Sequence, residues 1–223
     1  MTAAVPTAAA ALRLGIIDTG VNPWHSHVRG AVSGLRIFVD RDGKIREDAD
    51  FRDLVGHGTA VAGILRQGLP EAELFVVRVF DQALESYPSL VARGLLRAAA
   101  AGCRLINLSL GMSPGPGADV LAQACRTVQD AGCRLVAAGH PQRPGLLPAS
   151  LPGVIGVVAA DHLAPGEITL HPQRPYTHEA SGWPRDLLGL PPGANLWGNS
   201  FACARVTLEL ALQMGADQPR NLL

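Results

Sequence analysis

Apolar residues along this chain alternate between two patterns. Continuous apolar runs of strand length are separated by longer stretches in which apolar positions recur with helical spacing; the runs cover residues 12–17, 35–39, 74–80, 104–110, 134–138 and 154–159. Runs that are apolar at every position are typical of strands buried on both faces. The pattern therefore predicts an α/β fold, a mostly parallel sheet with helices on both faces.

Two of the predicted helices have well-defined ends. One begins near Pro88, with Ser86 as its N-cap, and ends at Gly102; the other covers about residues 118–131 and ends at Gly132. Proline suits a first helical turn, and a glycine after the last turn adopts the left-handed conformation that ends a helix. Both glycines precede the tripeptide Cys-Arg-Leu. The same helix-to-strand connection is therefore predicted twice.

Turn-forming residues define the remaining organisation. The Asp42-Gly43 pair between two apolar segments predicts a tight hairpin turn. Residues 141–152 and 165–192 are rich in proline and glycine, which predicts surface loops. Because we find no repeat, linker or change in composition, we expect one domain covering residues 1–223.

Composition and charge mainly exclude classes of protein. The 223 residues include 19 lysines and arginines and 19 aspartates and glutamates, and this balance argues against a nucleic-acid binder. No apolar run reaches the roughly 18 residues of a membrane-spanning helix. The alanine-rich residues 2–12 follow no cationic segment and contain Pro6, which is a poor match to a signal peptide. We expect a cytoplasmic protein without nucleic-acid or membrane partners.

Potential metal ligands occur, but not with the spacing of a known site. The four cysteines form no CxxC pair, so we expect buried reduced thiols, with a disulfide or a zinc site as the alternative. His25 and His27 have no evident third ligand. Four aspartates lack the EF-hand spacing, so a calcium site is only the alternative; they are Asp40, Asp42, Asp48 and Asp50. We expect no cofactor and no metal.

Five short segments place chemically useful residues at the ends of predicted elements. Three follow strands and two open helices; they are Asp18 to Gly20, Asn107 to Gly111, Ala137 to His140, Gly56 to Thr59 and Gly198 to Ala202. Sites in open parallel sheets form beyond the carboxyl ends of the strands, so Asp18, His57 and Ser200 are expected to converge. The Asp-Thr-Gly segment also occurs in aspartic proteases, but that interpretation leaves His57 and Ser200 unexplained.

The order Asp, His, Ser with these flanking residues resembles the subtilisin-like serine proteases, the subtilase family. The matching segments lie between residues 16 and 202. The resemblance implies a subtilisin-like three-layer fold in which Ser200 attacks a peptide carbonyl, His57 takes its proton and Asp18 orients His57. We therefore expect one hydrogen bond from Asp18 to His57 and another from His57 to Ser200.

The resemblance also implies substrate-binding residues. It implies that two segments pair with an extended peptide and form the pocket for the residue before the cut. These segments are Leu108, Ser109, Leu110 and Gly111, and Ala137, Ala138 and Gly139. His140 stands in the oxyanion position, where the family usually has asparagine. Because neutral imidazole carries one N–H, we expect a neighbouring acceptor to fix its tautomer, or the ring to be protonated.

Departures from the family pattern suggest a trimmed catalytic domain. Ala204 stands where the family usually has proline, and residues 66–70 are too short for the calcium loop of secreted members. We also expect no pro-domain, because the segment before Asp18 is too short for one. We expect Cys203, near one helical turn beyond Ser200, to pack in the core rather than act as a second nucleophile.

The sequence thus predicts a serine endopeptidase that works through an acyl-enzyme and processes a dedicated peptide or protein substrate. One alternative is a catalytically weak or inactive subtilase-like scaffold that binds a peptide. Another is acyl transfer to an amine instead of water, which is transpeptidation. A partner protein that completes or regulates the site also remains open.

Overall fold

The computed structural model describes residues 12–82, 84–170, 175–191 and 193–216. Within them lies a nine-stranded sheet with the order β3-β2-β4-β1-β5-β6-β7-β9-β8. The strands are β1 (Arg13–Asp18), β2 (Val32–Val39), β3 (Ile45–Asp48), β4 (Glu73–Arg78), β5 (Leu105–Leu108), β6 (Arg134–Ala138), β7 (Ile155–Ala159), β8 (Ile168–Leu170) and β9 (His178–Ala180). The helices are α1 (His57–Gly68), α2 (Pro88–Ala100), α3 (Ala118–Asp130) and α4 (Asn199–Ala216).

The central strands of the sheet are parallel. Only the two edge hairpins, β2 with β3 and β8 with β9, pair in antiparallel fashion. β1 lies between β4 and β5 and is parallel to both. The predicted mostly parallel sheet and the hairpin turn at Asp42-Gly43 are confirmed, and Gly43 has the positive φ of 75° that such turns favour.

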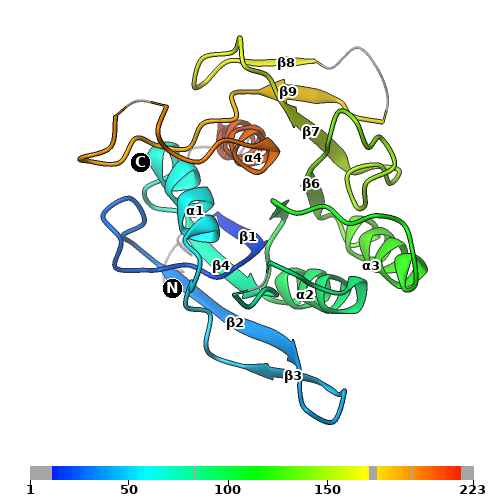
Figure 1. Cartoon of the computed structure of the whole chain (residues 1–223). Helices are drawn as coiled ribbons and strands as arrows, with labels where there is room; N and C mark the ends of the chain where they lie inside the picture. Colours follow the sequence, from blue (N-terminus) through cyan, green and yellow to red (C-terminus); the bar gives the residue numbers. More distant parts are fainter. Residues whose placement is uncertain (1–11, 83, 171–174, 192, 217–223) are drawn as a thin grey trace, which may run out of the picture.

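Helices cover the two faces of the sheet and make three layers (Figure 1). Leu14 and Ile16 of β1 face α1 and α4, whereas Ile17 belongs to the core on the side of α2 and α3. This alternation follows from the two-residue period of a strand. Because both faces are covered, every residue from Leu14 to Asp18 is buried, and Asp18 is held at the end of the most enclosed part of the sheet.

The predicted helix ends are confirmed with one correction. α2 begins at Pro88, but its N-cap is Tyr87, with φ −112° and ψ 147°; the expectation of Ser86 was wrong. A residue before proline favours this extended conformation, so Tyr87 already lies outside the helix. Gly102 and Gly132 have φ of 87° and 86°. The next N–H groups bond back to the carbonyls of residues 98 and 128, so both helices end in the same way.

The proline- and glycine-rich stretches are only partly the surface loops that we expected. Leu146, Leu147 and Ala149 are buried, and Leu147 exchanges two backbone hydrogen bonds of 2.9 Å with Met112. The second stretch contains β8 and β9, which are too short for an apolar period to reveal them. Residues 171–174 and 192 of that stretch, and residues 1–11 of the alanine-rich N-terminal segment, lie outside the described residues.

The four cysteines are buried and free. Burial raises the pKa of Cys103, Cys125 and Cys203 to about 12. Thiols with such pKa values are protonated at neutral pH and are poor nucleophiles. This supports a packing role for Cys203.

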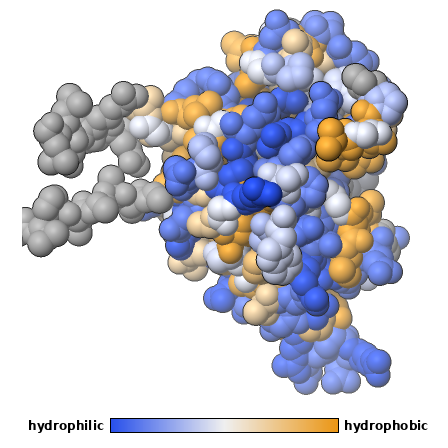
Figure 2. All heavy atoms as spheres, turned by 90° about the vertical axis from the view of Figure 1, so that its left-hand side faces the viewer, coloured by the Kyte–Doolittle hydropathy of each residue, from blue (hydrophilic) through white to orange (hydrophobic). Residues whose placement is uncertain are grey.

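Membrane crossing finds no support in the described helices, since none of them combines the length and the apolar character that a span requires. Figure 2 shows the face that carries α1, where apolar patches are separated by polar side chains.

Three of the four aspartates considered for calcium form ion pairs with arginines. Asp40 contacts Arg46 at 2.7 Å, and Asp50 contacts Arg52 at 2.6 Å. Asp48 contacts Arg36. These hydrogen bonds lower the pKa of Asp40 and Asp48, and that of Asp50 to about 2. In the described ranges, no group of three or more His, Cys, Asp or Glu side chains could hold a metal ion.

A calcium chelator is expected to leave the melting temperature of the protein unchanged. An ion stabilises a protein only where the folded state binds it, and the carboxylates of Asp40, Asp48 and Asp50 already have arginine partners. The measurement is a thermal melt with and without EGTA, after dialysis against calcium. A fall of several degrees in EGTA would contradict this interpretation.

Candidate active site

Asp18 and His57 form the centre of the site. Asp18 ends β1 and is 1% exposed, and its Oδ1 lies 2.7 Å from Nδ1 of His57, the first residue of α1. Oδ1 also accepts the N–H of Thr19 at 2.7 Å. With Nδ1 donating to the carboxylate, the neutral ring keeps a lone pair on Nε2. The first predicted hydrogen bond is confirmed, and His57 has the tautomer of a general base.

The close approach of α1 to β1 depends on Gly58. A Cβ atom at this position would lie 2.1 Å from the carbonyl oxygen of Gly20 and 3.0 Å from Oδ1 of Asp18. The N–H of Gly58 donates to the hydroxyl of Thr19 at 2.9 Å. The absence of a side chain at Gly58 therefore allows the first turn of α1 to rest on the end of β1.

The surroundings of His57 raise its pKa. Burial alone lowers the pKa of His57, but the charge of Asp18, its hydrogen bond and the charge of Asp53 outweigh burial and raise that pKa. The ring also lies near Phe201, with 5.5 Å between the ring centroids. A raised pKa makes His57 a stronger base toward a hydroxyl group.

Ser200 lies in the first turn of α4 and lines the same groove as His57. Its hydroxyl donates to the carbonyl oxygen of Ser109 at 3.0 Å, and the hydroxyl of Ser109 donates to the carbonyl oxygen of Ser200 at 2.8 Å. The predicted hydrogen bond between Ser200 and His57 is not formed in this conformation. The reason is local: the carbonyl at the end of β5 competes for the serine hydroxyl.

The start of α4 is fixed by contacts on both sides. Asn199 accepts the N–H of Ala159 at 2.8 Å through Oδ1. Below the groove, Asn107 of β5 accepts hydrogen bonds from Cys203 and Thr207 and donates to Ser109 at 2.9 Å. Because this buried network joins β5 to α4, it holds the serine in place. Because Ser200 lies in the first turn of α4, its N–H has no acceptor within that helix.

His140 follows β6 and lines the groove together with His57 and Ser200. Its Nδ1 lies 3.3 Å from the backbone N–H of Gln142, which donates to it. This contact assigns the proton of the neutral ring to Nε2. We expected an acceptor near the N–H of His140 to fix its tautomer, or the ring to be protonated. Instead, the N–H of Gln142 fixes the tautomer by donating to Nδ1.

The loop that carries His140 is anchored through its backbone. The hydroxyl of Tyr176 shares its one proton between the carbonyl oxygens of Arg143, at 2.6 Å, and His140, at 3.1 Å. The N–H of Arg143 also bonds to the carbonyl of His140. The anchor does not depend on the imidazole, so position 140 can be mutated with its backbone in place.

The groove has a volume of about 280 Å³. Of the residues assigned to substrate binding, five line it: Ser109, Leu110, Gly111, Ala138 and Gly139. Leu108 and Ala137 are completely buried in β5 and β6 and lie beneath the groove. Leu146 is an additional lining residue.

Asp53 supports the site and was missed in the sequence. Its carboxylate accepts hydrogen bonds from the hydroxyls of Thr19 and Thr59 at 2.9 and 2.6 Å, and from the N–H groups of Val55, Gly56 and Thr59. It thus joins the residue after Asp18 to the start of α1. An acceptor residue just before an apolar helix is the signal that could have identified it.

Asp53→Asn is expected to move the acidic limb of the pH profile of kcat/KM to lower pH. His57 must be neutral to accept a proton, and removing the charge of Asp53 removes one cause of its raised pKa. The neutral form is then populated at lower pH. The profile is measured between pH 5 and 9, with Asp130→Asn as an exposed control. A lower melting temperature with an unmoved limb would reduce Asp53 to a structural role.

Comparison with known proteins identifies the family. The family model described as "Subtilase family" matches residues 10–219. Thermostable alkaline protease from Halalkalibacterium halodurans is 32% identical over 160 residues, which cover 67% of this chain and 41% of that protein. Thermitase from Thermoactinomyces vulgaris is 33% identical over 136 residues, 56% of this chain and 46% of thermitase. The chain belongs to the subtilase family, and it spans less than half the length of these relatives.

Solved structures agree with this assignment. The self-cleaved protease domain of PatA is 26% identical, with a TM-score of 0.66, and the match covers 94% of this chain and 82% of that one. A cold adapted subtilisin-like serine proteinase has a TM-score of 0.67 at 20% identity, and the match covers 92% of this chain and 76% of that one. The second likeness shows the fold alone, which is the expected subtilisin-like three-layer arrangement.

Proposed function

We propose that the protein is a serine endopeptidase that cleaves a peptide bond through an acyl-enzyme. The observation that carries the proposal is the hydrogen bond of 2.7 Å between Asp18 and His57, at a groove that Ser200 also lines. Membership of the subtilase family supports the same assignment.

In the proposed reaction, Ser200 Oγ forms a bond to the carbonyl carbon while its proton passes to Nε2 of His57. Asp18 stabilises the resulting imidazolium. Nε2–H of His140 and the N–H of Ser200 donate to the oxygen that becomes negative. The imidazolium then protonates the leaving amine, and water releases the acyl group by the same steps in reverse order.

The acyl side of the groove supports a narrow substrate range, as expected for a dedicated processing enzyme. Leu146 packs so tightly against Gly111 that a Cβ atom on the glycine would lie 2.2 Å from Cδ2 of the leucine. We propose that the residue before the cut is small.

Leu146→Ala is expected to raise kcat/KM for peptides with phenylalanine before the cut by about 10-fold or more, with little change for alanine peptides. The substitution vacates the space beside Gly111, and methylene-sized differences in a pocket change specificity by about 10–200-fold. Leu121→Ala, on the buried face of α3, controls for destabilisation. Equal cleavage of both peptides by the unaltered protein would contradict the proposed small residue.

A peptide-binding scaffold is the second candidate, because the hydroxyl of Ser200 donates to Ser109 and not to His57. Labelling with a fluorophosphonate probe separates the two candidates. The protease is expected to acquire an adduct at Ser200, mapped by mass spectrometry, and to lose it in His57→Ala. A folded protein that remains unlabelled would favour the scaffold.

Transpeptidation is tested in a peptide-cleavage assay. If a primary amine added in excess appears in the product in preference to water, the acyl group is transferred and not hydrolysed. The peptide or protein substrate itself, and a protein that regulates the site, are to be sought with Ser200→Ala, which preserves binding.

A further inference from the structure

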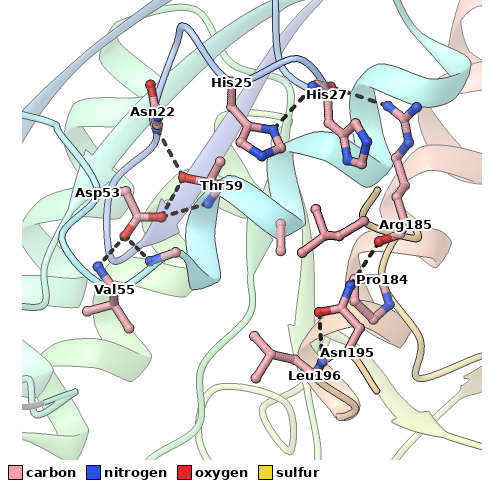
Figure 3. A pocket seen from close by; sticks show the side chains of 13 residues that line it. Asn22, His25, His27, Asp53, Val55, Thr59, Pro184, Arg185, Asn195 and Leu196 are labelled. Carbon is pink, nitrogen blue, oxygen red and sulfur yellow. Dashed lines mark hydrogen bonds between the residues drawn. The ribbon is translucent and has the colours of Figure 1, made fainter. Parts of the chain in front are cut away.

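A second cavity has a volume of about 410 Å³ (Figure 3). Gly56, Thr59 and Ala60 line it, whereas His57 lines the groove. Its opposite wall is formed by residues that precede α4, namely Pro184, Arg185, Leu187, Asn195 and Leu196. We call this space the side cavity. It borders both the segment that carries His57 and the segment that leads to Ser200.

The acidic and amide groups of the side cavity already have partners. Each oxygen of Asp53 accepts two or more hydrogen bonds. Asn195 donates to the carbonyl of Arg185 at 3.0 Å and accepts the N–H of Leu196 at 2.8 Å. These groups stabilise the walls and offer little to a ligand.

His25 and His27 are different, because their rings point into the cavity from the segment after β1 (Figure 3). Nδ1 of His25 accepts the N–H of His27 at 3.2 Å, which assigns the proton of the neutral His25 ring to Nε2. The rings meet edge to face, with centroids 5.1 Å apart. Across the part of the chain that the structure describes, Nε2 of His25 and both ring nitrogens of His27 have no hydrogen-bond partner.

A guanidinium group adds positive charge at the same end. Nη1 of Arg185 makes only long contacts, of 3.4 Å to the carbonyl of His27 and 3.5 Å to that of Gly63. No carboxylate among the described residues forms an ion pair with Arg185, whereas Arg46 and Arg52 each have one. Burial, then the charges of Arg185 and His25, lower the pKa of His27. This end of the cavity therefore favours a negative group.

The side cavity also lies on the side where the leaving part of a substrate must pass. The acyl side of the groove is lined by Leu110, Gly111, Gly139 and Leu146, and none of these lines the side cavity. A peptide whose carbonyl lies at Ser200 continues away from those residues after the cut. The segment after the cut is thereby directed toward the loop that contains Leu196.

We propose that the side cavity binds a carboxylate of the substrate segment after the cut, with Nε2–H of His25, the ring of His27 and the guanidinium of Arg185 as its partners. The inference rests on the proposed endopeptidase function. The carboxylate belongs either to an acidic side chain or to the C-terminus of that segment.

Paired peptides test the proposal and distinguish the two sources. One set carries Glu or Gln at the first, second or third position after the cut, and another ends in a free acid or an amide. In the set whose charged group binds in the side cavity, we expect kcat/KM to be at least about 10-fold higher for the charged peptide than for its neutral counterpart. A difference of this size corresponds to one charge-assisted hydrogen bond. Ratios near one in both sets would overturn the proposal.

Two substitutions test whether the ratio of kcat/KM between charged and neutral peptides depends on the side cavity. Arg185→Gln and His27→Gln are each expected to reduce the charged-to-neutral ratio to below about threefold, while Arg185→Lys retains part of it. Arg126→Gln, an exposed arginine on α3, is the matched control and should retain the full ratio. An undiminished ratio in both cavity variants, with melting temperatures showing that they fold, would place the carboxylate elsewhere.

Binding to Ser200→Ala separates a failure of this proposal from a failure of the proposed function. Calorimetry with the same peptides measures affinity without cleavage. Suppose that the unaltered protein cuts no peptide while the charged peptides still bind about 10-fold more tightly than the neutral ones. In that case the proposed carboxylate site is correct and the proposed endopeptidase function is wrong. Equal affinities would overturn the side cavity whatever the activity.

Discussion

Replacing His57 by alanine is expected to lower kcat by about 10⁶-fold, which is the loss measured for the corresponding group in subtilisin, a member of the same family. The physical reason is that an uncharged serine hydroxyl is a weak nucleophile unless a base takes its proton. In this chain His57 is the residue whose tautomer the contact with Asp18 prepares for that task. The measurement is turnover of a peptide substrate under saturating conditions.

Two further variants test whether the loss of activity is specific to the role of His57 as the base. His162→Ala, an exposed histidine beyond β7, should retain full activity. Asp18→Asn should cost about 10⁴-fold, because an amide no longer selects the tautomer of His57. A His57→Ala protein that keeps activity within tenfold of the unaltered protein would end the assignment of His57 as the base.

Replacing His140 by alanine is expected to lower kcat by about 10²–10³-fold, with KM little changed, the cost measured in subtilisin for loss of one oxyanion donor. Gln142 leaves Nε2 of the neutral ring as the donor, and His140 lines the groove beside Ser200. The melting temperature should stay the same, because Tyr176 holds the carbonyl of this residue and not its side chain.

His140→Asn then decides how well histidine performs. A higher kcat in this variant would mean that the natural site is detuned. Loss of turnover would mean that the imidazole supplies a donor that the shorter amide cannot place. If neither alanine nor asparagine at this position changes kcat, the assignment of His140 to the oxyanion is wrong.

The order of most strands and helices could be predicted because these elements have local signals. Proline favours the first turn of α2, the glycines after α2 and α3 adopt the left-handed conformation that ends a helix, and the strands buried on both faces are mainly apolar. The six apolar runs became β1, β2, β4, β5, β6 and β7. By contrast, β8 and β9 have three residues each, too few for a pattern.

The candidate site could be located but not completed from the sequence. The segments around Asp18, His57 and Ser200 lie at the ends of elements, so their convergence could be inferred from sheet geometry. The hydrogen bond from Ser200 to Ser109 and the donor that fixes His140 depend on where separate backbones meet. The side cavity could not be predicted either, because it is lined by residues from three separate segments of the chain, such as His25, Thr59 and Arg185.

The contact between Gly58 and Gly20 limits how far this protein can vary. Space for even one methyl group is absent where α1 begins, so substitution at position 58 must push the helix away from Asp18. A mutational library should hold Gly58 fixed. Diversity is better introduced at Leu187 and Leu196, which line the side cavity from the opposite wall. Substrate preference and the geometry of the reacting groups can thus change independently of each other.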